Sequence, residues 1–299
     1  MTKKIAIICP YFGKWPYWID LYFQSCKFNK GVDFCFFTDC EIKEAYKAEN
    51  IRFFQLSFQE YCQKVSDRLG ISFCPDNPYK LCDLKPFYGY VHEDLLVTYD
   101  FWGYCDVDLV WGDIKKFCAD KILDSKDVFS THADRVSGHF ALIRNTEHYR
   151  ELCFRIPAWQ NKLEDRGHYA LDEIDYSVLL YGKIVRVLWK IHGRLLKMNG
   201  IDEWKVYQRI LKVANALFKP KKLYFMEQDT TPFPDAIDRK AVRFRYEHGK
   251  LTNEISNKEV VYLHFLCLKK KWNESNYCVS NDSSSIVFTT EGIFSDENK

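Results

Sequence analysis

The sequence predicts an α/β protein whose central sheet is mostly parallel and flanked by helices. Two observations support this fold class. Continuous apolar runs alternate with amphipathic stretches through the first hundred residues, and the apolar runs end in polar loops. Uninterrupted apolar runs are typical of parallel strands covered on both faces, and such sheets are built by alternating strands with helices. Ligands of these sheets bind beyond the carboxyl ends of the strands, so those loops are where a site is expected.

The first elements follow directly from apolar spacing. Residues 4–9 predict a buried strand, residues 16–28 an amphipathic helix and residues 32–39 a second strand. A third strand is expected over 51–56 and a helix over 58–69. The later predictions are a helical stretch after Pro86, a strand through Tyr99–Asp113, a helix near 114–124, short strands at 128–131 and 140–143, and a helix over 171–180.

Composition limits the function classes. Hydrophobic residues make up 47% and charged residues 28%, which indicates a globular chain, and a net charge of +2 argues against nucleic acid as a partner. The twelve cysteines include no CxxC pair, which favours reduced thiols. The apolar run before Pro10 is too short for a signal peptide or a membrane span. We expect a cytoplasmic protein, with peripheral attachment to the inner face of the membrane as an open alternative.

One segment differs sharply from the rest in charge. Residues 183–222 contain eleven Lys or Arg against two acids, with large apolar residues between them. This predicts a basic amphipathic helical insertion of the kind that lies on anionic membranes, although a helical hairpin with a solvated basic face fits equally. The composition divides the chain into a core over 1–182, this insertion, a return to the core over 223–279 and a polar tail over 280–299.

Asp106 and Asp108 are the most informative residues of the chain. Two carboxylates two positions apart point to the same side of an extended strand, and the flanking residues are aromatic and β-branched. Carboxylates in such a setting are costly unless a cation or hydrogen-bond donors compensate them. Mg²⁺ or Mn²⁺ binds carboxylate oxygens and often shares its other positions with substrate phosphates. The triplet alone is weak evidence, because a chain of this length contains one by chance.

Three other segments strengthen the metal-site hypothesis. Tyr79–Lys85 places Asp83 between two cations. Ser137–Ile143 is a glycine turn that runs into a strand. Tyr262–Trp272 sets a histidine near a lysine cluster and a tryptophan.

Together these motifs resemble the GT-A glycosyltransferases, particularly the glycogenin-like and initiating-mannosyltransferase-like branches. In that family the Asp-x-Asp pair binds Mn²⁺ or Mg²⁺, and a late His-Phe-x-Gly-x-x-Lys-Pro-Trp segment supplies a third metal ligand and a lysine for the diphosphate. With His264 aligned, Lys270 falls at the family's Lys and Trp272 at its Trp. Cys267 and Lys271 depart from the family's Gly and Pro.

The resemblance implies a Rossmann-like GT-A core that binds a nucleotide-sugar, with residues 223–279 contributing acceptor and diphosphate contacts. It implies metal ligation by Asp106, Asp108 and His264, and diphosphate contacts from Lys270 with Lys85 or Lys269. The residues expected around the nucleoside and ribose are Pro10, Tyr11, Phe12, Asp39 and Asp83.

The donor sugar is expected near a second set of residues. Asp172 and Glu173 resemble the helix start that faces the sugar in the family, and they are the catalytic candidates. Gly138, His139 and Trp111 are the expected sugar and acceptor contacts, with Trp102 and His132 as further candidates. The resemblance implies transfer of a sugar, with retention favoured, from a nucleotide-sugar to a glycan or lipid-linked saccharide in surface polysaccharide synthesis. UDP is the expected nucleotide, by its frequency in the family.

Several alternatives remain open on the sequence alone. A metal-dependent nucleotidyltransferase or phosphohydrolase also pairs carboxylates with phosphate-binding cations, and a non-enzymatic carbohydrate- or membrane-binding protein would use the aromatic and basic faces. His264 alternates with apolar neighbours and fits a core histidine, while Asp39 fits a helix cap and Tyr11 a core position. Asp172 and Glu173 also suit the positive end of a helix whatever the function.

Overall fold

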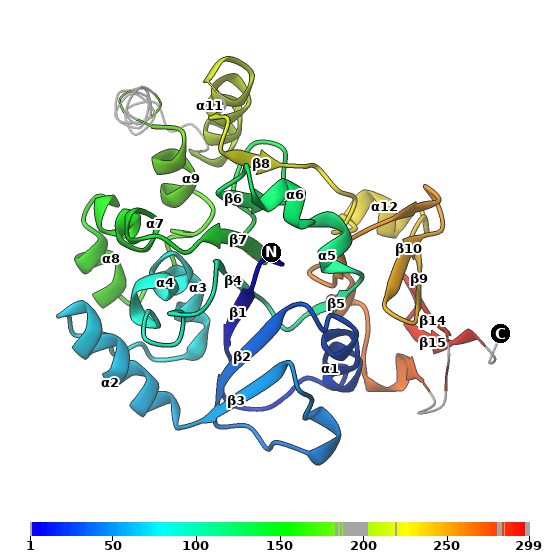
Figure 1. Cartoon of the computed structure of the whole chain (residues 1–299). Helices are drawn as coiled ribbons and strands as arrows, with labels where there is room; N and C mark the ends of the chain where they lie inside the picture. The colour runs from blue at the N-terminus through cyan, green and yellow to red at the C-terminus, as the bar shows by residue number, and fades with distance from the viewer. Residues whose placement is uncertain are drawn as a thin grey trace.

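A seven-stranded sheet forms the centre of the computed structural model, with strand order β3-β2-β1-β4-β7-β6-β8 (Figure 1). The structure describes residues 2–182, 185, 187, 203–218, 220–279, 283 and 285–296. The strands of this sheet are β1 Ile5–Pro10, β2 Asp33–Thr38, β3 Ile51–Gln55, β4 Phe101–Cys105, β6 Val128–Ser130, β7 Phe140–Arg144 and β8 Leu223–Phe225. Of these strands only β7 pairs antiparallel with its neighbours. The α/β class with a mostly parallel sheet is therefore confirmed.

Helices cover both faces of the sheet, as the apolar strands require. Successive residues of β1 point to opposite faces, so that Ile5 and Ile7 join one buried cluster and Ala6 and Ile8 the other. The first cluster is completed by α1 Ile19–Phe28, α5 Ile114–Phe117 and α6 Asp120–Leu123. The second is completed by α2 Phe58–Leu69, α3 Leu81–Leu84, α4 Tyr88–Val91, α7 Glu147–Glu151, α8 Trp159–Glu164 and α9 Asp175–Leu180.

Local sequence signals set the ends of α2, which matches the predicted helix. Ser57 caps the first turn by accepting a hydrogen bond from Glu60 N, and the Glu60 side chain accepts one from Ser57 N. Gly70 ends the helix in the left-handed conformation, with φ at 65°. The predicted helix near 114–124 is instead two short helices, and the one predicted from residue 171 begins at Asp175. The short 3-10 turns are η1 Glu44–Tyr46, η2 Pro78–Lys80, η3 Lys85–Phe87, η4 Leu152–Arg155, η5 Leu268–Lys270 and η6 Glu274–Asn276.

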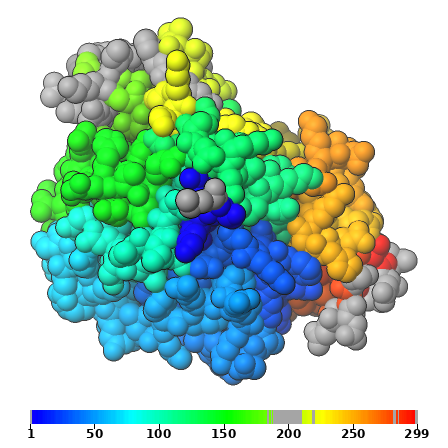
Figure 2. All heavy atoms as spheres, in the orientation of Figure 1, coloured from blue at the N-terminus to red at the C-terminus, as the bar shows by residue number. Residues whose placement is uncertain are grey.

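A second sheet of six strands lies beside the first, in the order β11-β10-β9-β14-β15-β13. Its strands are β9 Arg243–Glu247, β10 Lys250–Asn253, β11 Lys258–Glu259, β13 Tyr277–Cys278, β14 Ser285–Thr289 and β15 Ile293–Ser295, and helix α12 Pro234–Asp238 precedes them. In Figure 2 this C-terminal part forms a lobe at one side of the molecule. The expected polar tail over 280–299 is corrected, because residues 285–296 are part of this sheet and bury Ile286, Phe288 and Ile293.

The predicted strand through the aspartate pair is wrong in part. Strand β4 ends at Cys105 and β5 Leu109–Trp111 begins three residues later, so Asp106 and Asp108 lie in the bend between them. The chain turns there because β4 pairs within the central sheet, whereas β5 leaves it to pair antiparallel with β12 Tyr262–His264. The two carboxylates are therefore placed by a change of pairing partner rather than by strand alternation.

The basic insertion is described only in part. Helix α11 Glu203–Phe218 stands out at one end of the molecule in Figure 1, and Leu211 and Ala214 are buried against the core. Most of the first helix expected within 183–222 lies outside the described residues. Within the part of the chain that the structure describes, every helix falls short of the length and apolar character needed to cross a membrane.

Candidate functional site

Asp106, Asp108 and His264 converge from distant parts of the chain, as predicted. One donor atom from each lies within 4.8 Å of the others. The β5–β12 ladder brings them together, since it places His264 opposite Leu109, and Phe265 N donates a hydrogen bond to Asp108 O at 2.8 Å. Main-chain pairing thus fixes the histidine beside the second aspartate.

The donor set and its spacing fit a divalent cation. The Asp108 and His264 side chains are 9% and 4% exposed, whereas that of Asp106 is 31% exposed. His264 Nδ1 lies 3.3 Å from Thr231 Oγ1, and its Nε2 lies 3.4 Å from Asp108 Oδ2. Metal–oxygen bonds of about 2.1 Å put donors roughly 3 to 4 Å apart around an octahedral ion. Two carboxylates with one imidazole suit Mn²⁺, and the neighbouring hydroxyl orients the ring.

Two lysines accompany the two aspartates. Lys85 Nζ lies 2.5 Å from Asp106 Oδ1, and Lys269 Nζ lies 2.6 Å from Asp108 Oδ2. Lys85 is buried and also donates to Gly138 O at 2.6 Å. The motif resemblance favours Lys270 for a phosphate contact. In the structure Lys269 reaches Asp108, and Lys270 is exposed.

The local charges hold Asp108 and Lys85 ionised at neutral pH. Burial works to raise the pKa of Asp108, but His264 and Lys269 outweigh it and hold this pKa well below its ordinary value. Burial works to lower the pKa of Lys85, but the charge of Asp106 and other neighbours raises it well above its ordinary value. The site is therefore an arrangement of fixed charges of both signs.

Asp172 and Glu173 lie close to Lys85 and Gly138, in the turn that precedes α9. Asp172 Oδ2 is 3.8 Å from Lys85 Nζ, and Glu173 Oε1 accepts a hydrogen bond from Gly138 N at 3.1 Å. Burial raises the pKa of Asp172 to about 7, although the charge of Lys85 works against this. At neutral pH this carboxyl can therefore either hold or accept a proton.

Gly138 and His139 also reach the site. A Cβ on Gly138 would lie 2.8 Å from Glu173 Oε1 and 3.0 Å from Asp172 Oδ2, so a larger residue here would displace these carboxylates. The buried His139 ring stacks on His264 with 4.1 Å between ring centroids. Burial, with the positive charge of neighbouring side chains, lowers the pKa of His139 well below its ordinary value.

Three predicted site residues have structural positions instead. Asp83 is fully buried, pairs with Lys80 at 3.0 Å and accepts hydrogen bonds from Tyr169 N, so it anchors the segment before Asp172. Phe12 is buried between α2 and the sheet, and Trp111 is fully buried in the core. The aromatic and acidic composition of their segments does not distinguish ligand contacts from packing.

The loop after β1 is the segment predicted to contact the nucleoside. Tyr11 is half-buried and its ring stacks on Trp15 with centroids 5.0 Å apart. Pro10 is the last residue of β1, and Asp39 accepts a hydrogen bond from Gly13 N at 2.7 Å. Asp39 is exposed and holds the loop rather than capping a helix.

Sequence reasoning missed several neighbours of the site. Thr231 contacts His264, and Glu227 Oε1 lies 3.8 Å from His132 Nδ1. Arg135 Nε lies 4.0 Å from Glu173 Oε2. These residues lie in loops without a motif, and only their positions just after strands β6 and β8 could have suggested them.

Comparison with known proteins gives one strong match. No curated protein matches the chain. The solved structures that resemble it weakly include a galactosyltransferase LgtC in complex with donor and acceptor sugar analogs (14% identity, TM-score 0.32, 56% of this chain and 72% of that chain) and an active-site mutant of LgtC (13% identity, TM-score 0.32, 56% and 71%). Structures this dissimilar do not indicate the function of this chain. Residues 7–297 match the family of unknown function DUF6625, and the chain belongs to that family.

Proposed function

We propose that this chain is a metal-dependent glycosyltransferase of the GT-A type. It would transfer a sugar from a nucleotide-sugar, with UDP as the expected nucleotide, to a glycan or lipid-linked saccharide in surface polysaccharide synthesis. The observation that carries the proposal is the convergence of Asp106, Asp108 and His264 on one point, with Lys85 and Lys269 beside the two acids. Purely structural roles for a core histidine and two solvated acids would not explain this convergence.

The residues of the site match the needs of a departing diphosphate. Asp106, Asp108 and His264 would hold Mn²⁺ or Mg²⁺, which supplies positive charge against the two phosphates when bound. Lys269 is 36% exposed and has its ammonium at the metal ligands, so it can donate to a phosphate oxygen. Donors that are already in place act on the charge that develops as the bond to the sugar breaks. Lys270 stays a proposed second contact from the adjacent exposed position.

Asp172 and Glu173 are the proposed groups at the donor sugar. In the transfer, the bond from the anomeric carbon to the diphosphate breaks, a bond from the acceptor oxygen forms, and the acceptor hydroxyl loses a proton. A buried carboxyl with a pKa of about 7 suits hydrogen bonding to sugar hydroxyls and proton exchange near them. Gly138 and His139 lie beside these acids. The motif resemblance favours retention of the anomeric configuration.

The nucleoside is assigned to the loop after β1. This loop lies at the carboxyl end of a parallel strand, the usual ligand edge of such sheets. Tyr11 stacked on Trp15 offers a flat aromatic surface for a base, and the exposed Asp39 can accept hydrogen bonds from base or ribose. Pro10 sets the direction of the loop as it leaves the strand.

A donor screen by thermal shift tests the proposal. The full chain is heated with UDP-, GDP- and CMP-sugars, each with and without Mn²⁺. One nucleotide class should raise Tm only with the metal, because a ligand that binds the folded state at 100 times its Kd adds about 2.7 kcal/mol. Asp108→Asn should abolish the shift, whereas the control Asp94→Asn, an exposed acid elsewhere, should keep it. An equal shift in both variants would refute the assignment.

Product analysis separates the proposal from its alternatives. With donor and Mn²⁺, a glycosyltransferase forms a new glycoside only when a saccharide acceptor is present. A phosphohydrolase would release phosphate at the same rate without any acceptor. A nucleotidyltransferase would release pyrophosphate from a nucleoside triphosphate and a sugar phosphate, and either of those two results would replace the proposal.

A further inference from the structure

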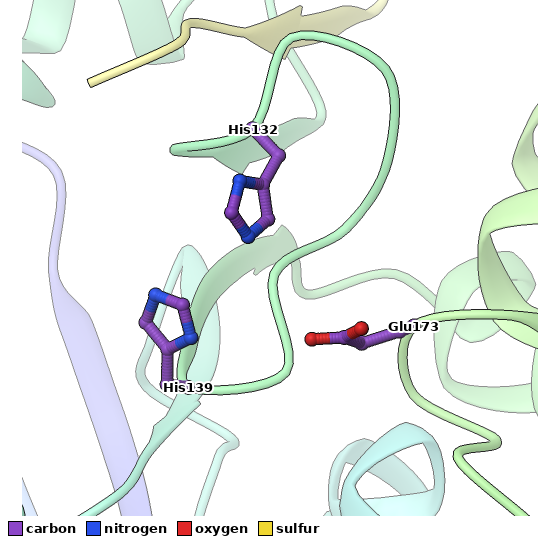
Figure 3. Close-up of side chains that lie close together, drawn as sticks. All are labelled: His132, His139 and Glu173. Atoms are coloured by element: carbon purple, nitrogen blue, oxygen red, sulfur yellow. The ribbon is translucent and has the colours of Figure 1, made fainter. Parts of the chain in front are cut away.

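A second group of potential metal ligands lies next to the first and includes none of Asp106, Asp108 and His264. His132, His139 and Glu173 each place one donor atom within 4.8 Å of the others. His132 follows strand β6, His139 immediately precedes β7, and Glu173 comes from the turn before α9. Figure 3 shows the two rings facing each other across one loop, with the Glu173 carboxylate directed toward them from the opposite segment.

The second observation is the burial of the two histidine rings. His132 is 8% exposed and His139 is 6% exposed. His139 Nε2 is buried and has no hydrogen-bond partner among the described residues. A buried nitrogen left in this state costs about 1 to 3 kcal/mol, and coordination of a cation would remove the penalty. Figure 3 shows this ring directed toward His132.

The surroundings of His132 complete the arrangement. Its Nδ1 lies 3.8 Å from Glu227 Oε1, and Glu227 is itself held by a hydrogen bond from Ala133 N at 2.8 Å. A carboxylate behind the outer nitrogen of a metal-bound histidine fixes the ring and increases its basicity. Glu227 therefore lies where such a supporting acid is expected.

We propose that His132, His139 and Glu173 bind a first-row transition-metal ion, with Zn²⁺ the best-matched species. Two imidazoles and one carboxylate are a donor set that zinc uses when it keeps one position open for water or another ligand. Bonds of about 2.0 to 2.2 Å put tetrahedral donors roughly 3.5 Å apart, within the spacing of this group. The set differs from the oxygen-rich aspartate site, which suits Mn²⁺ or Mg²⁺.

This second ion would tie together three loops of the site. It would fix the segment between β6 and β7 to the turn before α9, next to the stacked pair of His139 and His264. It would also engage Glu173, which leaves Asp172 as the member of the acidic pair that is free of metal. The inference concerns metal binding alone, and it stands whichever reaction the site performs.

The test uses Co²⁺ as a visible probe and the metal-stripped full chain. Four-coordinate Co²⁺ absorbs visible light strongly, whereas six-coordinate Co²⁺ in an oxygen-rich site absorbs weakly. The wild type should develop the strong band with one equivalent of Co²⁺ and lose it when Zn²⁺ is added. His132→Gln and Glu173→Gln should abolish the band, and Asp106→Asn should retain it. His148→Gln, at an exposed histidine, is the matched control and should retain it.

Four results decide between these outcomes. A strong band that disappears in both first variants supports the inference, as does a Zn²⁺ affinity that falls roughly 10- to 100-fold in Glu227→Gln. Absence of the band in the wild type overturns it. Loss of the band in Asp106→Asn but not in Glu173→Gln also overturns it, by assigning the ion to the aspartate group. Glu173 is partly exposed, so its variant keeps the test valid if His132→Gln fails to fold.

Discussion

Gly138 links most of the charged groups of the site through its backbone. Its carbonyl accepts a hydrogen bond from Lys85 at 2.6 Å, and its N–H donates one to Glu173 at 3.1 Å. A side chain here would collide with the carboxylates of both Asp172 and Glu173. The absence of a side chain at Gly138 therefore leaves room for the carboxylates of Asp172 and Glu173 beside this backbone position.

Gly138→Ala should destabilise the protein by about 1 to 3 kcal/mol, because the added methyl group forces two carboxylates to move. Its Mn²⁺ affinity should also fall, since Lys85 would lose its fixed position beside Asp106. Urea unfolding and a Mn²⁺ titration measure the two effects. Gly31→Ala is the control, because the Cβ there meets only the flexible Lys115 side chain. Equal stability of the two variants would contradict the expectation.

The raised pKa of Asp172 makes a prediction about pH. Burial favours its protonated form in the folded state, where the pKa is about 7, whereas the unfolded chain has a value near 3.9. The folded protein thus binds more protons over this range, and the metal-free protein should lose stability as pH rises from about 4 to 7. Asp172→Asn removes that loss, which is at most about 4 kcal/mol for three pKa units.

Denaturant unfolding of metal-free wild type and Asp172→Asn at pH 5 and pH 8 measures this difference. The variant should be relatively more stable at the higher pH. An identical pH dependence in both proteins would mean that Asp172 titrates normally.

Among the elements, the short β5–β12 ladder has the largest influence on the site. It holds only three residue pairs, from Tyr262 with Trp111 to His264 with Leu109. At its end, Gly112 packs so closely that a Cβ would lie 2.5 Å from Val260 O. This ladder connects the C-terminal sheet to the aspartate bend, so the integrity of that sheet should matter for metal binding.

Deletion of residues 280–299 tests how much this C-terminal sheet contributes to stability. The deletion removes β14, whose pairing partner is the central strand β9, and exposes the apolar residues around Phe288. Burial of each large apolar side chain is worth about 1.5 to 3 kcal/mol, so the loss should approach the whole stability of an ordinary domain. Circular dichroism melting should show a large fall in Tm. Deletion of residues 297–299 is the control, and a silent 280–299 deletion would restore the polar-tail hypothesis.

At the scale of the whole molecule, the basic insertion is the main feature outside the catalytic proposal. The described helix α11 carries the exposed Lys212 and presents Val213 and Leu217, which are 56% and 68% exposed. Exposed apolar residues beside basic ones are typical of helices that lie on anionic membranes. We propose that this segment attaches the protein to such a surface, where a lipid-linked acceptor would be found.

Removal of positive charge within the insertion should weaken this attachment. The variant changes Lys190, Arg194, Lys197 and Lys212 to Gln. Each basic residue near an anionic surface contributes about 1 kcal/mol, so cosedimentation with phosphatidylglycerol vesicles at low salt should fall by orders of magnitude, while donor hydrolysis is spared. The control changes four exposed lysines elsewhere, Lys30, Lys43, Lys121 and Lys258. Equal binding by the two variants would exclude the insertion as the attachment site.

The sequence by itself determined the local elements and the choice of the proposed metal ligands. Strands β1, β2 and β3 and helix α2 were predictable because apolar runs, amphipathic spacing and the Ser57–Glu60 cap are local signals. The trio of Asp106, Asp108 and His264 was predictable from motifs in a known order. These features depend on short stretches of chain, each of which carries its own physical signature.

Only the tertiary structure decided which candidates reach the site. In the folded chain Trp111 and Asp83 are buried, and Lys269 rather than Lys270 contacts Asp108. Much of the predicted polar tail forms strands of the second sheet. It also brought His132, His139 and Glu173 together. The reason is that a buried anchor and a ligand contact can have the same residue type and the same local pattern. Their roles differ only in which distant segments surround them, and pairing between strands far apart in sequence determines those surroundings.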